Sequence, residues 1–372
     1  MKMSIQRESF SHLFHLAAVV APQRSPKNII QNVLIEAIGK EAIISATDME
    51  LSIRLRTDAV TIHKPGAIVV PVQRFAAVLK EVVDDSILIE VVNNIAVITG
   101  ASSRFELPLK SPDEFPSIEL FDDKNYLEIS SRIFKEMIRR TAFAADAEST
   151  RYALSGVLLE LQNEHLLTAV ATDGRRLAKM DGSVKVVGEI NTQQTTIVPT
   201  KTMQLIERML PEDDSPLMVG GDSNQLRVKS SNGVIHSRLV EGRYPRWKDA
   251  IPKQRESLKL AMMAGTLHAA LRQAAIVADD DTRGVDMKFS NGVLVVNSQA
   301  AEVGHARIEV PINYDGPVVE TALDLRYLTE MLRTLPPELL VDMDIEGPQT
   351  AAYLKTSDSF GYVLMPLTRK NH

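Results

Sequence analysis

At its centre the chain reads Ala171-Thr172-Asp173-Gly174-Arg175-Arg176-Leu177-Ala178, directly after the apolar run Leu166 to Val170. The Asp-Gly pair predicts a tight turn, because glycine adopts positive φ at no steric cost. Such a turn would place Arg175 and Arg176 at the end of a strand and would face Leu177 towards an apolar neighbour. We expect the rest of the chain to be organised around this turn.

Related stretches lie about 125 residues to either side of the turn, and a regular spacing of this kind indicates internal repetition. Ile44-Ser45-Ala46-Thr47-Asp48-Met49-Glu50 precedes it, and Val295-Val296-Asn297-Ser298-Gln299-Ala300 follows it. The chain is therefore predicted to hold three copies of one unit, and the middle copy carries an elaboration.

Each copy is predicted to contain two helices and several strands. Helical spacing of apolar residues predicts helices over 9–20, 72–83, 131–144, 200–210, 265–278 and 324–335. Short alternating or apolar runs predict strands over 32–37, 41–47, 51–56, 86–92, 95–99, 103–108, 126–129, 156–161, 166–171, 225–229, 234–239, 287–289, 293–297 and 360–367. Hairpin turns are predicted at Asn93-Asn94, Asn232-Gly233 and Asn291-Gly292. The predicted fold class is α+β, with helices on antiparallel sheets in three tandem similar domains at 1–122, 123–252 and 253–372.

Composition narrows the class of protein. A hydrophobic content of 44% over 372 residues is ample for packed cores. The sequence has no cysteine, which excludes a disulfide framework, a thiolate metal site and a cysteine nucleophile. The N-terminus lacks the layout of a signal peptide, and no apolar run approaches the roughly 20 residues of a membrane helix. We therefore expect a cytoplasmic protein.

The distribution of charge points to a polyanion. The formal net charge is −6, which by itself would argue against such a partner. The predicted helices, however, hold eleven Lys or Arg against five Asp or Glu, so they carry +6 and the rest of the chain −12. Lys and Arg are also common on the solvated face of any helix, but this surplus occurs in all three copies. Few aromatic residues accompany the charges, so the pattern favours contact with phosphates over stacking on bases.

A search for catalytic or metal-binding residues finds little. Asp173 could be a catalytic carboxylate, but the turn explains the Asp-Gly pair. Asp279-Asp280-Asp281 lacks the glycine spacing of a calcium loop, and Gly220-Gly221-Asp222 lacks the Gly-Lys-Ser/Thr of a phosphate loop and is predicted to be a turn. The eight His residues show no metal-ligand pairing. We expect no cofactor and no metal, and a tripled fold without a reaction centre favours a scaffold or a tether.

Many weak motifs occur in a fixed order along essentially the full chain. They are Met1-Lys2 with Arg24, Thr47 to Glu50, Gly66 to Phe75, Ser103 to Phe105, Asp113 to Pro116, Arg151 to Gly156, Ala171 to Ala178, Ile197 to Pro199, Leu239 to Pro245 and Tyr362 to Leu367. In this order and spacing they resemble the family of bacterial DNA sliding clamps, the beta subunit of DNA polymerase III.

The resemblance implies a head-to-tail ring of two subunits with three similar domains each. Twelve helices would line a hole that holds duplex DNA, and an outer layer of sheet would surround them. Such a ring holds DNA by topology, without sequence specificity, and performs no chemistry. Its implied partners are a clamp loader, the DNA polymerase III catalytic subunit, and other polymerases and repair proteins that carry clamp-binding peptides. The implied setting is the nucleoid within the cytoplasm.

The resemblance also assigns roles to individual residues. The peptide cleft, expected to be apolar with arginine at its rim, would contain Leu154, Thr172, Gly174, Arg175, Arg176, Leu177, Pro245, Met365, Pro366 and Leu367. The DNA-facing residues would be Arg24, Lys80, Lys135, Arg139, Lys201 and Arg272. The subunit interface would bring Arg104 and Phe105 near Ile276 and Val277. The bare sequence favours a core role for Leu177 and Met365, and the resemblance favours the cleft instead.

The chain departs from the family pattern at several positions. Position 175 is Arg where the family often has His, and Asp249-Ala250 stands where a basic-apolar pair is common. The resemblance therefore does not determine which peptide sequence the cleft prefers. Glu148 replaces a usual Gln inside the ring. The acidic cluster of the third-domain interface is thinner, with Glu302 prominent, and Thr368 to His372 extend beyond the usual end.

Two other functions remain open at the level of sequence. One is an enzyme whose active site forms between repeats, which would need a convergent acid–base pair. The other is a clamp-like paralogue that dimerises and binds peptides but does not encircle DNA. Neutralising Arg24, Lys80 and Lys201 separates them, because a clamp should lose loading or DNA retention and stay dimeric.

Overall fold

A computed structural model describes residues 1–146, 152–190, 196–252, 258–278, 284–300 and 302–367. The chain forms two compact units. The first contains Met1–Lys135, Val184–Asn191 and Lys201–Leu239, and the second contains Glu136–Ser183, Thr192–Thr200 and Val240–His372. The middle third of the chain therefore contributes to both units, and the predicted boundaries at 122/123 and 252/253 stay a prediction.

The described residues form six α-helices, and each overlaps a predicted helix. They are α1 (Arg7–Val20), α2 (Val72–Glu81), α3 (Ser131–Thr141), α4 (Thr200–Met209), α5 (Ala264–Ala274) and α6 (Leu325–Leu332). Short 3₁₀ helices are η1 (Asn28–Gln31), η2 (Pro112–Glu114), η3 (Ala142–Ala144), η4 (Tyr152–Ser155), η5 (Trp247–Ala250) and η6 (Ala275–Val277). The predicted ends of α3 and α5 tighten into η3 and η6, as helix ends often do. At the start of α6, the carboxylate of Asp324 accepts the N–H groups of Arg326 and Tyr327, which is an N-cap.

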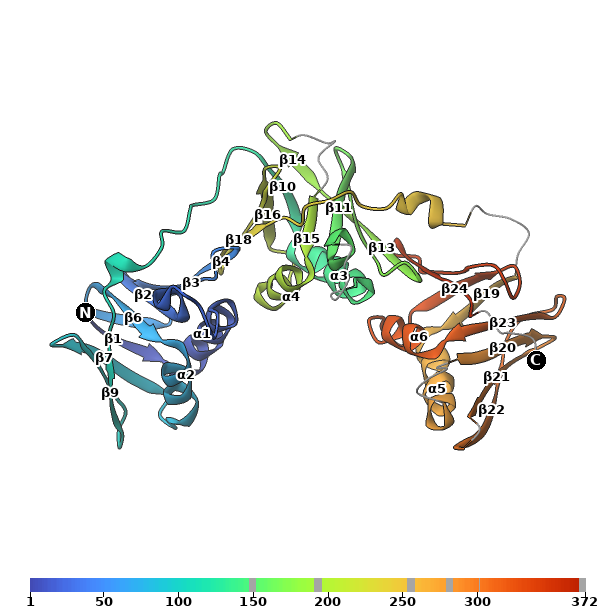
Figure 1. The fold of residues 1–372 in the computed structure, drawn as a ribbon, viewed down its shortest axis with the longest axis horizontal. Helices are drawn as coiled ribbons and strands as arrows, with labels where there is room; N and C mark the ends of the chain where they lie inside the picture. Colours follow the sequence, from blue (N-terminus) through green and yellow to red (C-terminus); the bar gives the residue numbers. More distant parts are fainter. Residues whose placement is uncertain (147–151, 191–195, 253–257, 279–283, 301, 368–372) are drawn as a thin grey trace. The chain divides into compact units, whose positions relative to one another are not determined.

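Two sheets, antiparallel throughout, make up the first unit (Figure 1). The smaller has the order β5-β1-β7-β8-β9: β5 (Val60–Lys64), β1 (Lys2–Gln6), β7 (Ser86–Val92), β8 (Ile95–Thr99) and β9 (Arg104–Pro108). The larger has the order β14-β10-β16-β17-β18-β4-β3-β2-β6: β14 (Lys185–Val187), β10 (Tyr126–Ser130), β16 (Pro216–Gly221), β17 (Gln225–Ser230), β18 (Gly233–Arg238), β4 (Leu51–Thr57), β3 (Glu41–Thr47), β2 (Asn32–Ile38) and β6 (Gly66–Pro71).

The second unit has the same plan. Its larger sheet has the order β15-β11-β12-β13-β26-β25-β24-β19: β15 (Thr196–Pro199), β11 (Gly156–Asn163), β12 (Leu166–Thr172), β13 (Arg176–Ser183), β26 (Phe360–Leu364), β25 (Ala352–Lys355), β24 (Leu340–Ile345) and β19 (Leu258–Met263). Its smaller sheet has the order β22-β21-β20-β23: β22 (Gly304–Pro311), β21 (Val293–Ala300), β20 (Gly284–Ser290) and β23 (Val319–Asp324).

Each large sheet joins strands from two successive repeats. In the first unit β18 pairs with β4, and in the second β13 pairs with β26. The corresponding pairs are Ser237 opposite Leu51 and Leu177 opposite Val363. Backbone hydrogen bonds therefore fasten one repeat to the next twice in the chain, in the same way.

Helix packing fills the core of the first and third repeats. Phe10 and Phe14 of α1 are fully buried against Phe75 of α2, and the Phe14 and Phe75 ring centroids are 4.8 Å apart. In the third repeat, Leu267 of α5 and Leu328 of α6 are buried in the corresponding way. Burying a large apolar side chain of this kind stabilises the fold by roughly 1.5–3 kcal/mol.

The turns confirm most of the predicted hairpins. Asn93 and Asn94 both have positive φ between β7 and β8, as a two-residue hairpin turn requires. Asn291-Gly292 joins β20 to β21 as predicted. The prediction of Asn232-Gly233 was displaced by one residue: Ser231 and Asn232 form the turn, and Gly233 already pairs with Ser230.

Other predicted elements need correction. The predicted turn at Gly220-Gly221-Asp222 begins too early, because β16 continues through Gly221 and the turn follows at Asp222. No predicted strand corresponds to β1, β5, β6, β13, β14, β15, β16, β19, β22 or β23. In β22 the exposed face carries His305, Arg307 and Glu309, so an apolar alternation is hard to see.

The described helices do not include one that is long and apolar enough to cross a membrane. Among the described residues, no three His, Cys, Asp or Glu side chains are grouped so that they could hold a metal ion. Asp279-Asp280-Asp281 lies outside the described residues.

Gly233 provides a test of the junction between β18 and β4. Its φ is 153°, and a Cβ there would collide with the carbonyl oxygen of Arg54 on the neighbouring strand. Gly233→Ala is therefore expected to lower the free energy of unfolding by about 2–4 kcal/mol, measured by chemical denaturation. Gly39→Ala is the matched control, because Gly39 also has positive φ but has open space around it; it should cost about 1 kcal/mol. Equal losses for the two variants would contradict this account of the junction.

Candidate functional site

The predicted central turn joins β12 to β13. The Oδ1 atom of Asp173 accepts the N–H groups of Arg175 (2.9 Å) and Arg176 (3.0 Å). The Oγ1 atom of Thr172 accepts the N–H of Gly174 (3.1 Å) and donates to the carbonyl oxygen of Arg176 (2.6 Å). Gly174 has a φ of 89°, which favours glycine. The turn is thus fixed by its own side chains, and the prediction is confirmed.

The first repeat contains the same turn. Thr47 Oγ1 accepts the N–H of Met49 and donates to the carbonyl of Leu51. Asp48 Oδ1 accepts the N–H groups of Glu50 and Leu51, and Met49, with a φ of 80°, takes the place of Gly174. The stretch predicted for the third repeat, 295–300, differs because it lies within β21 and its hairpin turn follows later. The turn is therefore repeated once, and not twice as predicted.

An apolar cluster lies beside the central turn. Its buried members are Ala153, Leu158, Val170, Leu177, Ile197, Tyr244, Trp247 and Val363. Tyr244 donates its O–H to the carbonyl of Val170 (3.1 Å), and burial raises the pKa of its phenol. Because these residues come from η4, β11, β12, β13, β15, β26 and the segment after Val240, the cluster exists only in the folded second unit.

The segment after β26 lies against this turn. The N–H of Met365 donates to the carbonyl of Arg175 (2.9 Å), and the N–H of Leu367 donates to the carbonyl of Ala322 (2.8 Å). The side chain of Met365 is 50% exposed although it adjoins the buried β26. An exposed and flexible thioether beside an apolar cluster is typical of surfaces that accept apolar side chains of a partner.

The ten predicted cleft residues all belong to the second unit, but they differ in exposure. Arg175, Pro245 and Gly174 are exposed, Pro366 and Leu367 are half-buried, and Leu154, Thr172 and Leu177 are buried. Leu177 belongs to the apolar cluster, so it is part of the core and can at most form the floor of a cleft.

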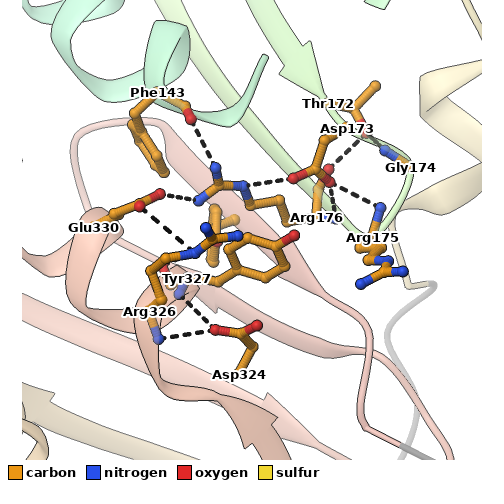
Figure 2. A network of polar contacts seen from close by, with 11 residues as sticks. Phe143, Thr172, Asp173, Gly174, Arg175, Arg176, Asp324, Arg326, Tyr327 and Glu330 are labelled. Atoms are coloured by element: carbon orange, nitrogen blue, oxygen red, sulfur yellow. Dashed lines mark hydrogen bonds and ion pairs between the residues drawn. The ribbon is translucent and has the colours of Figure 1, made fainter. Parts of the chain in front are cut away.

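Arg176 does not lie at a rim, which corrects the expected position. Its side chain is enclosed by three acceptors (Figure 2): Nε donates to Asp173 Oδ2 (3.0 Å), Nη1 to Glu330 Oε2 (2.5 Å) and Nη2 to the carbonyl of Phe143 (2.8 Å). The guanidinium also lies over the ring of Tyr327, 4.1 Å from its centroid. Burial works against the charged form, but the hydrogen bond to Glu330 and the nearby acidic groups outweigh it and raise the pKa of Arg176. Arg176 is therefore held, charged, inside the protein.

Sequence reasoning missed Phe143, Tyr327 and Glu330. Glu330 is 154 residues from Arg176 in the sequence. The one sequence signal at Glu330 is its spacing from Arg326, which is that of an (i, i+4) ion pair on a helix. No sequence pattern connects a residue of α6 with the central turn.

The surface near Pro245 carries its own charge network. Trp247 Nε1 and Lys248 Nζ both donate to Glu160 at 2.7 Å. Burial raises the pKa of Glu160, but these two hydrogen bonds outweigh it and leave the pKa lower than usual. Asp249, which departs from the family pattern, forms an exposed ion pair with Arg246 at 3.3 Å.

The predicted DNA-facing residues are present on helices of all three repeats and on the segment after α1. Arg24, Lys80, Arg139, Lys201 and Arg272 are exposed. Lys135 is less exposed: its ammonium donates to the carbonyl of Leu210 (3.0 Å) and pairs with Glu212 (2.7 Å), whereas the pair of Lys201 with Asp48 is longer (3.5 Å). Its charge is therefore partly neutralised within the first unit. Glu148 lies outside the described residues.

The surplus of positive charge persists in the observed helices. They again hold eleven Lys or Arg against five Asp or Glu. Arg140 does not contribute to the surface, because it is 3% exposed and pairs with Asp358 at 2.6 Å. A cavity of about 250 Å³ between α3 and the end of α6 is lined by Arg139 and Arg333 among others, which leaves this part of the second unit basic.

The predicted interface residues lie on or beside two sheet edges. β9 and β22 are each the last strand of a small sheet, so one side of each has no strand partner among the described residues. Arg104 on β9 is exposed and pairs with Glu106 (2.8 Å), and Phe105 is half-buried. Ile276 in η6, next to β22, is 77% exposed, and Val303 is 61% exposed. The structure thus leaves an apolar patch beside an open strand edge.

Known proteins resemble the chain over nearly its full length. Residues 1–119, 128–246 and 248–368 match, in order, the family models of the N-terminal, central and C-terminal domains of the DNA polymerase III beta subunit. The beta sliding clamp of Chlamydia muridarum is 29% identical over 99% of both chains, and that of Escherichia coli K12 is 27% identical over 99% of this chain and 100% of its own. A crystal structure of the Pseudomonas aeruginosa sliding clamp bound to griselimycin is 27% identical and superposes with a TM-score of 0.88, covering 99% of this chain and 100% of that one.

Proposed function

Because the chain belongs to the family of the DNA polymerase III beta subunit and is a sliding clamp with no catalytic step of its own, we propose that it confers processivity by encircling duplex DNA as a head-to-tail ring of two subunits. It would work in the cytoplasm in association with the nucleoid, where its DNA lies. The alternative of an enzyme whose active site forms between repeats is set aside.

The observation that carries the ring is the way in which repeats are joined. Within the chain, β18–β4 and β13–β26 fasten each repeat to the next through antiparallel pairing. A third junction of this kind needs two further free edges, and β9 in the first repeat and β22 in the third supply them. Pairing β9 of one subunit with β22 of the next, twice, would close a ring. The apolar side chains of Phe105, Ile276 and Val277 would then be buried at each interface.

The basic helices support a role in holding DNA. Lys and Arg attract phosphates without reading sequence, and a closed ring needs only weak phosphate contacts to slide. We assign this role to Arg24, Lys80, Arg139, Lys201 and Arg272. Lys135 is a weaker candidate, because it is already bound to Glu212.

The apolar cluster and Met365 support a peptide cleft in the second unit. A short peptide from a partner would place a Leu or Phe side chain on Leu177 and against Met365, while Arg175 lies exposed nearby. The partners that we propose are the polymerase III catalytic subunit, a clamp loader, and other polymerases and repair proteins that carry such a peptide.

Retention on circular DNA tests the proposed function. The protein is loaded on nicked circular duplex DNA with a clamp loader and ATP, and the bound fraction is measured before and after the circle is cut. A topological link predicts that the protein stays on circles and runs off linear ends. Equal retention on both forms, or none with a competent loader, would contradict the clamp.

Charge neutralisation then tests the DNA-facing residues. The triple variant Arg24→Gln, Lys80→Gln and Lys201→Gln should load several-fold less at about 0.1 M salt, because it loses phosphate contacts, and it should remain dimeric. Each lost contact also reduces the slope of log K against log salt concentration by about 0.9. Lys40→Gln, Arg56→Gln and Lys64→Gln together are the control, since these cations are also exposed but lie on strands and a turn. If the triple variant loads as well as the control does, these residues do not face DNA. If the wild-type protein forms the dimer and binds the peptide but does not load at all, the clamp-like paralogue is favoured.

A further inference from the structure

We propose that Glu330 of α6 is a positioning residue for the peptide cleft and that it acts through Arg176. This inference rests on the proposed cleft. Neither residue needs to touch the peptide: Arg176 is enclosed inside the protein, and Glu330 faces Arg176 and Arg326 (Figure 2).

The guanidinium of Arg176 is fixed by groups from three different elements. Asp173 comes from the turn between β12 and β13, the carbonyl of Phe143 from η3, and Glu330 from α6. Tyr327 closes one face of the guanidinium. A planar group that is hydrogen-bonded on each of its three nitrogens and covered on one face has little freedom to rotate. The position of Arg176 is therefore defined jointly by the second and the third repeat.

The backbone of Arg176 connects its fixed side chain to the residues of the proposed cleft. Its carbonyl accepts the hydroxyl of Thr172, and its neighbour Arg175 supplies the carbonyl that holds Met365. Arg176 pairs with Leu364 across β13 and β26, and the next pair is Leu177 with Val363. A shift of Arg176 would thus move the apolar floor and the anchor of Met365 together. Binding energy depends on such preorganisation.

Glu330 is the partner most open to change among the three acceptors. Asp173 is needed for the turn itself, because its Oδ1 atom bonds two backbone N–H groups, and the Phe143 acceptor is backbone. The side chain of Glu330 is 33% exposed, and its other near neighbour is Arg326 at 3.9 Å. Changing Glu330 to Gln keeps the shape and removes the charge that faces a buried cation. The variant is therefore expected to fold and to loosen Arg176.

Peptide affinity tests this inference. A fluorescein-labelled peptide that carries Leu and Phe is titrated with the full-length protein, and anisotropy gives Kd. Glu330→Gln should weaken binding about tenfold, while dimerisation remains unchanged. Glu330→Asp, which keeps the charge, should recover part of the loss. Glu320→Gln is the matched control, since Glu320 is an exposed carboxylate of the same repeat that pairs with Lys288, and it should bind as the wild type does.

A double-mutant cycle with Arg176→Lys distinguishes coupling from a general loss of stability. If Glu330 acts through Arg176, the double variant binds no more weakly than Arg176→Lys alone. Additive losses, or wild-type affinity of Glu330→Gln, would overturn the inference and leave the cleft in place. A wild-type protein that does not bind the peptide would overturn the proposed cleft itself, and this inference with it.

Discussion

Ile276→Arg is expected to convert the ring into monomers. In the single subunit the side chain of Ile276 is 77% exposed, so an arginine there should leave the fold intact. In the proposed ring the side chain at this position of η6 is buried against β9 of the other subunit. An unpaired charge there would be desolvated. A cost of about 3 kcal/mol weakens one interface roughly 100-fold. Since a head-to-tail dimer contains the interface twice, the dissociation constant should rise by about 10⁴.

Analytical ultracentrifugation at micromolar concentration measures this effect directly. Leu120→Arg is the control, because Leu120 is also apolar and 74% exposed, but its neighbours Glu119 and Phe121 contact Arg227 of β17 and Tyr126 of β10 in the larger sheet. The control should remain dimeric. An Ile276→Arg protein that still sediments as a dimer would show that η6 is not at the interface, and a monomeric wild type would contradict the ring.

Met365→Asp is expected to weaken partner binding strongly while leaving the ring unchanged. The side chain of Met365 is half exposed, so its replacement should not destabilise the fold. An apolar peptide side chain seated against Met365 would instead desolvate a carboxylate without a partner, which costs about 2–3 kcal/mol. Affinity for the Leu- and Phe-containing peptide should therefore fall about 30- to 100-fold, and DNA synthesis with the polymerase should lose its processivity.

The first repeat provides the control for this variant. Met49 occupies the equivalent turn, is 51% exposed and has a φ of 80°, a conformation that aspartate tolerates. Met49→Asp should bind the peptide as the wild type does. If both variants bind normally, the peptide does not use Met365; if both lose binding equally, the effect is one of net charge and not of the cleft.

Local patterns in the sequence determined much of the fold. The helix bounds follow from apolar spacing, and each predicted helix overlaps an observed one. The Thr-Asp turn was predictable because its hydrogen bonds join residues two to four positions apart, and it formed in both of the first two repeats. Exposed edge strands such as β22 were missed, because an edge that shows polar residues to solvent carries no apolar alternation.

The candidate site could be predicted only in part. The resemblance named Leu177, Met365 and Arg176, and the structure brings the backbone of all three together along β13 and β26. It also separates their roles, because Leu177 is buried in the apolar cluster, Met365 is exposed and Arg176 is enclosed. Lys135 was predicted to face DNA, and its bond to Glu212 could not be foreseen from a spacing of 77 residues.

Local sequence patterns were enough to predict the six helices, most of the hairpin turns and the surplus of positive charge on the helices, since these depend on neighbours within a few residues. Only the tertiary structure decided that β13 joins β26, that β9 and β22 remain open edges, and that Glu330 reaches Arg176 across 154 residues. The physical reason is that the burial of a charged group depends on what packs around it. A guanidinium on the surface and one enclosed by Asp173, Glu330 and Phe143 have the same sequence neighbours and different functions.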